Sequence, residues 1–397
     1  MPRLPAGLDG SCDDQFAPVA ELVAAQIESG EHHGVAVAIR HRGEPVADFW
    51  GGTRGTLAEP DAEQPWTADT MALSYSTTKG IASTALHMVM ERTGVAYDTL
   101  VADVWPEYSK GRSAAKASTT IRHVLCHEAG VPQIRGEVPD VTDMADFDAM
   151  VSMVERLEPL WQPGTKNGYH AVNFGWLVGE LVRRLDGRTI DVVIAEEIAG
   201  PLGLDGLFVS TPPAEHGRVA PVRGLSFDEG DVDRLAALLP PDNLLVRALA
   251  PEGDMQAFVN SPAGLEAVAP AWSGVFTARS LATVYAALER GGALGDVRLL
   301  TTDTIATITA VQNKRPDLVL FFPMHWRLGY MGGGSEWSPA GPNRAAFGHS
   351  GLGGSVAFAD PAAEISMAIT LDRLEVELLA GPRIRAAVTA AVTAAVA

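Results

Sequence analysis

Cysteine is nearly absent from this chain of 397 residues, which contains only Cys12 and Cys126. Two cysteines cannot form the disulfide framework that holds many secreted proteins together. Scarce cysteine is instead typical of proteins that fold in a reducing compartment. The composition therefore favours a cytoplasmic location.

Long apolar segments are also absent. Residues 1–16 are interrupted by proline, glycine and aspartate, so they contain no apolar core of a secretory signal. No stretch of the sequence reaches the roughly 20 consecutive apolar residues that a membrane helix needs. The sequence thus predicts neither export nor a membrane partner.

Basic residues are outnumbered: 30 lysines and arginines stand against 49 acidic residues, for a formal net charge of −19. Such a charge repels phosphate backbones and anionic lipid headgroups. We therefore expect a small-molecule substrate and no nucleic-acid partner. The sequence leaves open whether the chain forms a homo-oligomer.

Apolar residues, by contrast, make up 47% of the chain and charged residues 20%, which is typical of a folded globular protein. The chain is longer than the length at which one hydrophobic core usually stops growing. Two lobes, or one large composite domain, are therefore expected.

Helical patterns fill much of the chain. The spacing of apolar residues predicts helices over 18–28, 78–92 and 174–185, and a closing helix from Pro382. Residues 210–262 are rich in proline, glycine and aspartate and support no definite assignment.

Strand patterns occur mainly near the two ends of the chain. The runs 34–39 and 45–50 flank a turn and predict one hairpin. The runs 354–358 and 365–371 predict a second hairpin in the same way. Strands at both ends and few between them favour one antiparallel sheet assembled from the two termini.

These patterns together predict an α/β (α+β) fold, in which helices flank the antiparallel sheet and a mainly helical lobe is inserted. We expect a single domain with an α/β lobe at approximately 1–75 and 265–397 and a helical lobe at approximately 76–264. Within the helical lobe, residues 106–119 and 132–143 are predicted to be loops.

Ser76 and Lys79 lie three residues apart at a predicted junction between a strand and the helix 78–92. A serine hydroxyl is a poor nucleophile unless a base lies within hydrogen-bond reach, and a lysine can be that base. Residues i and i+3 share one face of a helix, so the two side chains should be neighbours. The positive potential of a helix N-terminus favours an alkoxide and lowers the pKa of a lysine. Ser-x-x-Lys also occurs by chance, as a helix cap followed by a solvated lysine.

Tyr169 is the candidate for a third catalytic group, because the proton must also reach the leaving group. It lies in the turn-forming segment 161–170, directly before the helix 174–185. The alternative interpretation is a tyrosine that only anchors this loop by packing and hydrogen bonding.

The segment 347–355 is rich in glycine and predicts a strand whose bare backbone can direct an N–H group at an acyl oxygen. Residues 348–352 superficially match the nucleophile elbow Gly-x-Ser-x-Gly. However, the fifth position is Leu352, and no strong helix follows. We therefore reject Ser350 as the nucleophile.

Five segments resemble the serine β-lactamase and penicillin-binding-protein family, in particular its class C-like branch that contains the family VIII carboxylesterases. The resemblance covers most of the chain and implies a β-lactamase-like fold. In order along the chain, the segments are 76–79, 121–130, 163–169, 277–282 and 348–351.

The resemblance also implies roles for particular residues. Ser76 would be acylated, and Lys79 and Tyr169 would act as base and proton shuttle. The backbone N–H groups of Ser76 and Leu352 would form the oxyanion hole. Which of Lys79 and Tyr169 takes the first proton is open, and no cofactor is implied.

Two positions depart from the family pattern. The expected substrate-binding segment His349, Ser350 and Gly351 stands where the lactamases have Lys-Thr-Gly. A mostly neutral histidine holds a substrate carboxylate less well than a lysine does. Ala171 stands where Tyr-x-Asn has its asparagine, so the amide that would grip a peptide-like side chain is missing. Both departures favour uncharged esters.

The sequence therefore predicts a serine carboxylesterase that hydrolyses small to medium uncharged esters through an acyl-enzyme on Ser76. One alternative is an amide or β-lactam hydrolase. Another is a penicillin-binding-like module without catalytic activity.

A metal site is the remaining possibility that the sequence raises. His123, Cys126 and His127 fall on one face of a helix, as metal ligands can. No carboxylate pair or second histidine cluster accompanies them, so we expect no metal there.

Overall fold

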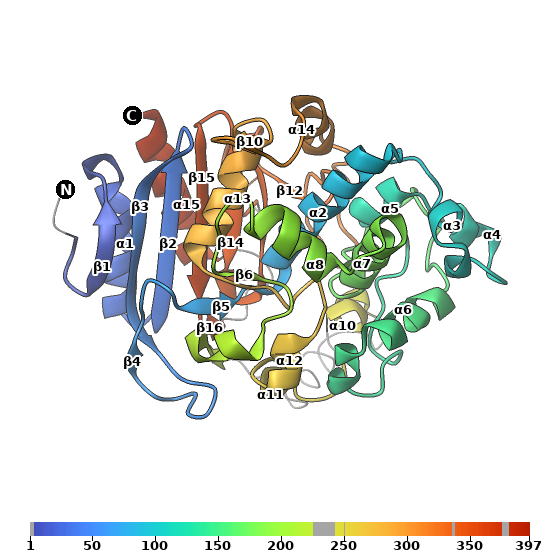
Figure 1. Cartoon of the computed structure of the whole chain (residues 1–397), viewed down its shortest axis with the longest axis horizontal. Coiled ribbons are helices and arrows are strands. Elements are labelled where there is room, and N and C mark those ends of the chain that lie inside the picture. The colour runs from blue at the N-terminus through green and yellow to red at the C-terminus, as the bar shows by residue number, and fades with distance from the viewer. Residues whose placement is uncertain (1–3, 225–242, 250, 336–337, 375–380) are drawn as a thin grey trace.

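The computed structural model describes residues 4–224, 243–249, 251–335, 338–374 and 381–397 (Figure 1). An antiparallel sheet with helices on both faces lies at one side, and a mainly helical part lies at the other. This arrangement confirms the predicted α/β fold with a sheet built from both ends of the chain.

The main sheet joins the two ends of the chain through the pairing of β2 with β15, which runs from Val35 opposite Leu371 to His41 opposite Ile365. Both predicted hairpins are present, as β2 with β3 and as β14 with β15. The strands lie in the order β1 (Leu8–Cys12), β3 (Glu44–Arg54), β2 (Gly34–His41), β15 (Ile365–Leu371), β14 (Val356–Asp360), β13 (Phe347–Ser350) and β12 (Met331–Gly332), with β4 (Gln64–Pro65) beside β3.

Helices cover both faces of this sheet. On one face lie α1 (Ala17–Glu28) and α15 (Pro382–Val396), which confirm the predicted first and closing helices. On the other face lies α13 (Ala278–Glu289), in front of the sheet in Figure 1. Because both faces are covered, every residue of β15 is buried.

The side chains of the central strands alternate between two cores. Val37 and Ile39 of β2 pack in the cluster that includes α1 and α15, whereas Ala38 packs in the cluster that includes α13. Successive side chains of a strand point to opposite faces, so one strand can serve both cores. Small residues on the α13 side let this helix lie close to the sheet, and Ser366 Oγ donates a hydrogen bond of 2.8 Å to the carbonyl of Ala282.

The helical part is organised around α2 (Thr78–Thr93) and α7 (Asn173–Asp186), which pack against each other. Both end as predicted, at Gly94 and Gly187, whose φ angles of 72° and 90° suit glycine. Further helices are α3 (Val101–Val104), α4 (Ala114–Ala117), α5 (Ile121–Leu125), α6 (Phe147–Arg156), α8 (Ile190–Ile194) with η5 (Ala195–Ala199), α10 (Leu244–Leu249), α11 (Met255–Val259), α12 (Pro262–Glu266) and α14 (Thr302–Thr309).

A smaller sheet leads into α2. It contains β6 (Leu207–Phe208), β9 (Val275–Phe276), β5 (Met71–Leu73) and β7 (Val219–Ala220), in that order. Strand β5 continues through the short turn η2 (Tyr75–Thr77) into α2. The predicted junction of strand and helix around Ser76 is therefore confirmed.

Two predicted loops contain short helical segments instead. Residues 106–119 include η3 (Pro106–Tyr108) and α4, and residues 132–143 run into η4 (Val141–Ala145). Local side-chain caps explain the difference: Ser113 Oγ, for example, accepts a hydrogen bond from the first turn of α4. Of the unassigned segment 210–262, residues 225–242 and 250 lie outside the described residues.

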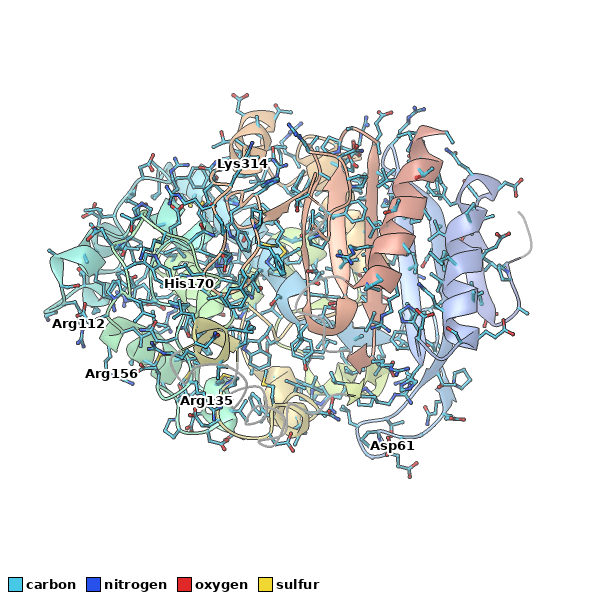
Figure 2. The ribbon with its side chains drawn as sticks, turned by 180° about the vertical axis from the view of Figure 1, so that it is seen from behind. Asp61, Arg112, Arg135, Arg156, His170 and Lys314 are labelled. Carbon is cyan, nitrogen blue, oxygen red and sulfur yellow. The ribbon has the colours of Figure 1, made fainter. Side chains whose placement is uncertain are left out.

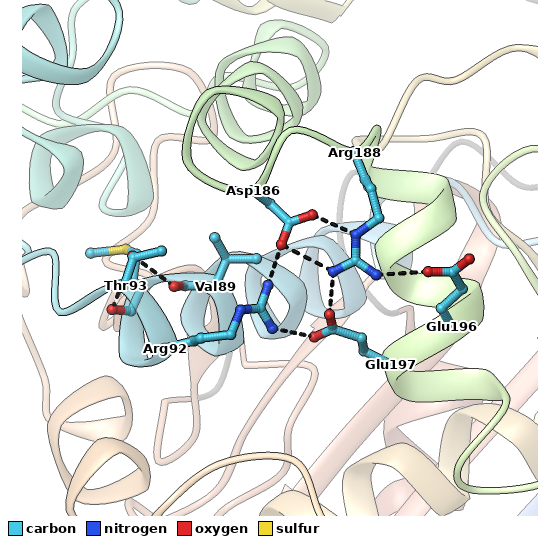
Figure 3. Close-up of polar contacts among 8 residues, drawn as sticks. Val89, Arg92, Thr93, Asp186, Arg188, Glu196 and Glu197 are labelled. Atoms are coloured by element: carbon cyan, nitrogen blue, oxygen red, sulfur yellow. Dashed lines mark hydrogen bonds and ion pairs between the residues drawn. The ribbon is translucent and has the colours of Figure 1, made fainter.

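A network of ion pairs fixes the C-terminal ends of α2 and α7 (Figure 3). Arg92, in the last turn of α2, contacts Asp186 at the end of α7 and Glu197 of η5. Arg188 contacts the same two carboxylates and also Glu196. Each arginine is partly exposed, so the individual pairs contribute little to stability, but a connected set limits how the helices can slide.

Among the described helices, none has the length and apolarity needed to cross a membrane.

Asp317 is a buried carboxylate that holds the loop before α7 in place. It is 1% exposed and accepts hydrogen bonds from five N–H groups. An ionised carboxylate can accept several such bonds, and a group so well satisfied fixes its donors. The donors are the side chains of Asn167 and Trp326 and the backbone N–H groups of Tyr169, Val319 and Leu320.

We predict that Asp317→Asn lowers the free energy of unfolding by about 1–3 kcal/mol, because the amide replaces one acceptor oxygen with an NH2 group, and the N–H donors that faced that oxygen lose their partner. Urea denaturation followed by circular dichroism measures the change. Asp61→Asn, at an exposed aspartate, is the control and should change stability by less than about 0.5 kcal/mol. Equal stability of the two variants would contradict the anchoring role.

Candidate active site

The turn that carries Ser76 has an unusual backbone. Tyr75, the residue before the serine, has a φ angle of 43°, in the left-handed region that bulky residues rarely adopt. Burial of its ring and a hydrogen bond from Thr78 Oγ1 to its carbonyl, at 2.5 Å, hold this conformation. Strained residues of this kind persist only where the surroundings impose them, and they cluster at functional sites.

Lys79 is buried and directed at Ser76. Its Nζ lies 3.0 Å from Ser76 Oγ, 2.7 Å from the carbonyl oxygen of Ala171 and 3.0 Å from that of Ala271. The side chain is 0% exposed, and burial holds the pKa of Lys79 well below its ordinary value.

The hydrogen bonds of Lys79 show what a neutral amine does there. A neutral amine has two N–H groups and one lone pair, and the two carbonyl oxygens can only accept. With both N–H groups donated to Ala171 and Ala271, the lone pair is left for the hydroxyl hydrogen of Ser76. This arrangement is that of a base beside a nucleophile.

A second Ser-x-x-Lys sequence in the chain is arranged differently. Lys116 Nζ, three residues after Ser113, donates to three carbonyl oxygens, those of Val154, Glu155 and Leu157. Ser113 Oγ instead accepts a hydrogen bond from the backbone N–H of Lys116. Three carbonyl acceptors occupy all the N–H groups of an ammonium and leave no lone pair. Lys116 thus caps the end of α6, and the motif alone does not define a catalytic pair.

Tyr169 lies beside Lys79, as predicted for a third group. Its ring centroid is 4.8 Å from Lys79 Nζ, and the side chain is buried. Burial raises the pKa of the Tyr169 phenol above its ordinary value, and an interaction with the Ser76 hydroxyl acts in the opposite direction. The hydroxyl makes no hydrogen bond of ordinary geometry within the described part of the chain. Tyr169 is therefore a neutral phenol whose O–H group lies next to the serine.

His349 presents a neutral ring to the same site. Its Nδ1 lies 2.8 Å from the carbonyl oxygen of Ser350 and must donate to it, so Nε2 carries the lone pair. Nε2 is buried and has no partner among the described residues. Burial lowers the pKa of His349 to about 3. The ring stacks on Tyr169 with centroids 6.1 Å apart.

The strand predicted over 347–355 ends at Ser350 and is followed by a short helical turn, and Gly351 between them lies directly against the turn that carries Ser76. Strand β12 pairs only with Phe347 and Gly348 among the described residues, so the following part of β13 is bonded on one side only, to β14. At Gly351, a Cβ atom would come within 2.1 Å of the carbonyl oxygen of Ser74. Only glycine permits this approach, which brings the turn of Leu352 beside that of Ser76.

The histidines and the cysteine of the considered metal site have structural contacts. His123 Nδ1 accepts a hydrogen bond from the backbone N–H of Thr120 and caps α5. His127 Nδ1 accepts one from the backbone N–H of His170, on the helical side of the molecule in Figure 2. Cys126 is buried and unpaired. In the part of the chain that the structure describes, no three histidine, cysteine or acidic side chains are grouped to hold a metal ion.

The structure thus brings Ser76, Lys79, Tyr169 and His349 into one site and adds residues that sequence reasoning missed. Asp317 fixes the backbone of Tyr169, and the carbonyl of Ala271 fixes Lys79. Neither lies in a recognisable motif.

Comparisons with known proteins identify the family of the chain. The family model described as Beta-lactamase matches residues 19–390. The Mycobacterium tuberculosis protein called esterase/beta-lactamase LipL is 33% identical over 379 residues, which cover 92% of this chain and 83% of that protein.

Solved structures are similar over nearly the whole chain. A family VIII carboxylesterase superposes with a TM-score of 0.86 at 32% identity, covering 98% of this chain and 99% of that one. A penicillin-binding protein homologue from Caulobacter crescentus superposes with a TM-score of 0.83 at 31% identity, with the same coverage. The resemblance and the fold predicted from the motifs are confirmed: the chain belongs to the β-lactamase family and is a serine hydrolase of that fold.

Proposed function

We propose that this protein is a carboxylesterase that hydrolyses small to medium uncharged esters through an acyl-enzyme on Ser76. The observation that carries the proposal is the position of Lys79 Nζ, which lies 3.0 Å from Ser76 Oγ and donates to the backbone carbonyls of Ala171 and Ala271. A buried lysine of lowered pKa in this position serves as a general base.

The first step forms the acyl-enzyme. Ser76 Oγ attacks the ester carbonyl carbon while its proton passes to the lone pair of Lys79. The N–H groups of Ser76 and Leu352 donate to the oxyanion. The lowered pKa of Lys79 and the raised pKa of Tyr169 favour Lys79 as the first base. Tyr169, as a neutral phenol, then relays the proton to the leaving alkoxide.

The second step releases the acid. Water attacks the ester bond to Ser76, and its proton moves back along the same groups to Ser76 Oγ as the carbonyl re-forms. The neutral amine of Lys79 is restored, so each turnover ends with the protonation states with which it began.

The substrate class follows from His349. A substrate carboxylate would meet a neutral ring whose buried free nitrogen is an acceptor, not a donor. Burying an anion without a charged partner is costly. The carboxylesterase and esterase/beta-lactamase names of similar proteins support esters as the main substrates, with β-lactams as the second candidate.

Ser76→Ala should abolish hydrolysis of p-nitrophenyl acetate and leave the fold intact. A fluorophosphonate probe should modify the wild-type protein on Ser76, as peptide mass spectrometry would locate. Continued hydrolysis by the variant, or an adduct on a different serine only, would refute the proposal. Labelling without turnover of esters or of a chromogenic cephalosporin would instead favour a binding module.

The pH dependence of stability tests the protonation state of Lys79. The pKa of Lys79 is lower in the folded than in the unfolded chain. At a pH between the two pKa values, the unfolded chain therefore binds one proton more than the folded chain. Stability then rises with pH across that window. Lys79→Met removes this dependence and should also lower kcat by about 10²–10⁴-fold.

We therefore predict that the wild type gains stability relative to Lys79→Met as pH rises toward the ordinary lysine pKa of about 10.4. Urea midpoints at several pH values measure the difference. The exposed Lys166 supplies the control, since Lys166→Met should show no such trend. A difference that is constant with pH would mean that Lys79 is protonated in the folded protein.

Substrate preference can be shifted at His349. We predict that His349→Lys increases the ratio of cephalosporin to p-nitrophenyl acetate turnover by about tenfold. The bound carboxylate is the opposite charge that keeps the introduced, buried lysine protonated, and a gain of about 1.4 kcal/mol corresponds to that ratio. His349→Gln, which is neutral, is the control and should leave the ratio near that of the wild type. If both variants shift the ratio equally, charge at this position does not select the substrate.

A further inference from the structure

Two buried hydroxyl groups lie between the turn that carries Ser76 and the turn that carries Leu352. Ser355 and Thr77 are 2% and 0% exposed. Ser355 Oγ donates a hydrogen bond of 2.8 Å to the carbonyl of Ser74 and lies 3.1 Å from Thr77 Oγ1. These bonds join η7 (Leu352–Gly354) to η2, although the residues are almost 280 positions apart in the chain.

The direction of the bonds follows from counting hydrogens. A hydroxyl group has one hydrogen, and that of Ser355 is donated to the carbonyl of Ser74. The hydrogen between the two hydroxyls must therefore come from Thr77. The result is an ordered chain from Thr77 through Ser355 to the backbone of Ser74.

Backbone hydrogen bonds also close the turn that carries Leu352. The N–H group of Gly351 donates to the carbonyl of Ser355 at 2.7 Å, and that of Gly354 donates to the carbonyl of Gly351 at 3.2 Å. A Cβ atom on Gly351 would lie 2.3 Å from Ser355 Oγ. The Leu352 turn is thus closed on itself and attached to the serine turn through Ser355.

We propose that Ser355 and Thr77 are positioning residues that set the gap between the N–H groups of Ser76 and Leu352. This inference rests on the proposed function, in which these two groups stabilise the oxyanion. Donors are effective only when about 2.7–3.1 Å from the position of the oxyanion. A displacement of about 1 Å can cost about 10²-fold in rate. A bond between the two turns therefore acts on the transition state without touching the substrate.

A matched control is available in the neighbouring strand. Ser366 Oγ also donates to a backbone carbonyl, that of Ala282, at 2.8 Å, and the residue is 1% exposed. This hydroxyl joins β15 to α13 and not the two turns. Ser366→Ala therefore loses the same kind of buried bond as Ser355→Ala but leaves the oxyanion hole in place.

The experiment compares Ser355→Ala with Ser366→Ala in kcat, KM, thermal stability and affinity for a boronic acid, which forms a tetrahedral adduct on the serine. Both variants should lose similar stability. Only Ser355→Ala should lower kcat, by about 10- to 100-fold, with KM little changed. Its affinity for the boronic acid should fall by a similar factor.

Substitutions at Thr77 give an independent test that does not depend on Ser355→Ala being well folded. Thr77→Val removes the hydroxyl at nearly constant shape and should lower kcat, whereas Thr77→Ser keeps the hydroxyl and should restore it. The double variant Ser355→Ala/Thr77→Val should be little worse than Ser355→Ala, because both changes break one chain of bonds.

Equal kcat values for Ser355→Ala and Ser366→Ala, or a change confined to KM, would overturn the inference. So would equal activity of Thr77→Val and Thr77→Ser. Failure of the proposed function would look different: Ser76→Ala would remain active or the boronic acid would not bind the wild type. An inactive Ser76→Ala beside a fully active Ser355→Ala would refute the positioning role alone.

Discussion

The hydrogen bonds of Lys79 are the constraint on which the site depends. A lysine that is 0% exposed and bonded to two carbonyls and a hydroxyl has no charged partner among those contacts. An ammonium there would bear the full cost of burial, several kcal/mol in real proteins. Burial therefore favours the neutral amine. A neutral amine is also what the proposed mechanism requires of Lys79 as its base.

The partners of this lysine come from segments far apart in the sequence. Ala171 precedes α7, and Ala271 precedes β9. Because both partners are backbone carbonyls, the position of Nζ is set by the path of the main chain. The same holds for Asp317, which binds the backbone of Tyr169, and for Ser355, which binds that of Ser74. The site is rigid because its side chains are bonded mainly to main chain, which the surrounding core fixes.

The dependence of the site on main-chain groups from distant segments explains which features could be predicted from the sequence. Hairpins and helices such as 34–54 and 78–93 depend on local periodicity and turns, so their patterns are visible in the chain. Ser76 and Lys79 are visible because they lie on one turn. The contrast with Ser113 and Lys116, which have the same spacing, shows that the motif needs its surroundings. Those surroundings come from segments with no pattern of their own.

Asp317 illustrates why the rest could not be predicted. Its role depends on five donors that are brought together only by folding. The prediction that residues 106–119 form a loop was wrong for a local reason: the single cap at Ser113 is enough to close a helical turn.

The electrostatics of the site disfavour a negatively charged substrate. Burial lowers the pKa values of Lys79, which contacts Ser76, and of His349, which stacks on Tyr169, so it favours the neutral form of both side chains. The formal charge of the chain is −19, so the field that an approaching anion meets is unfavourable. A substrate carboxylate loses its hydration when it enters the site. Neither long-range attraction nor a positive charge on Lys79 or His349 would offset that cost. An uncharged ester bears no such cost, which supports uncharged esters as the proposed substrates.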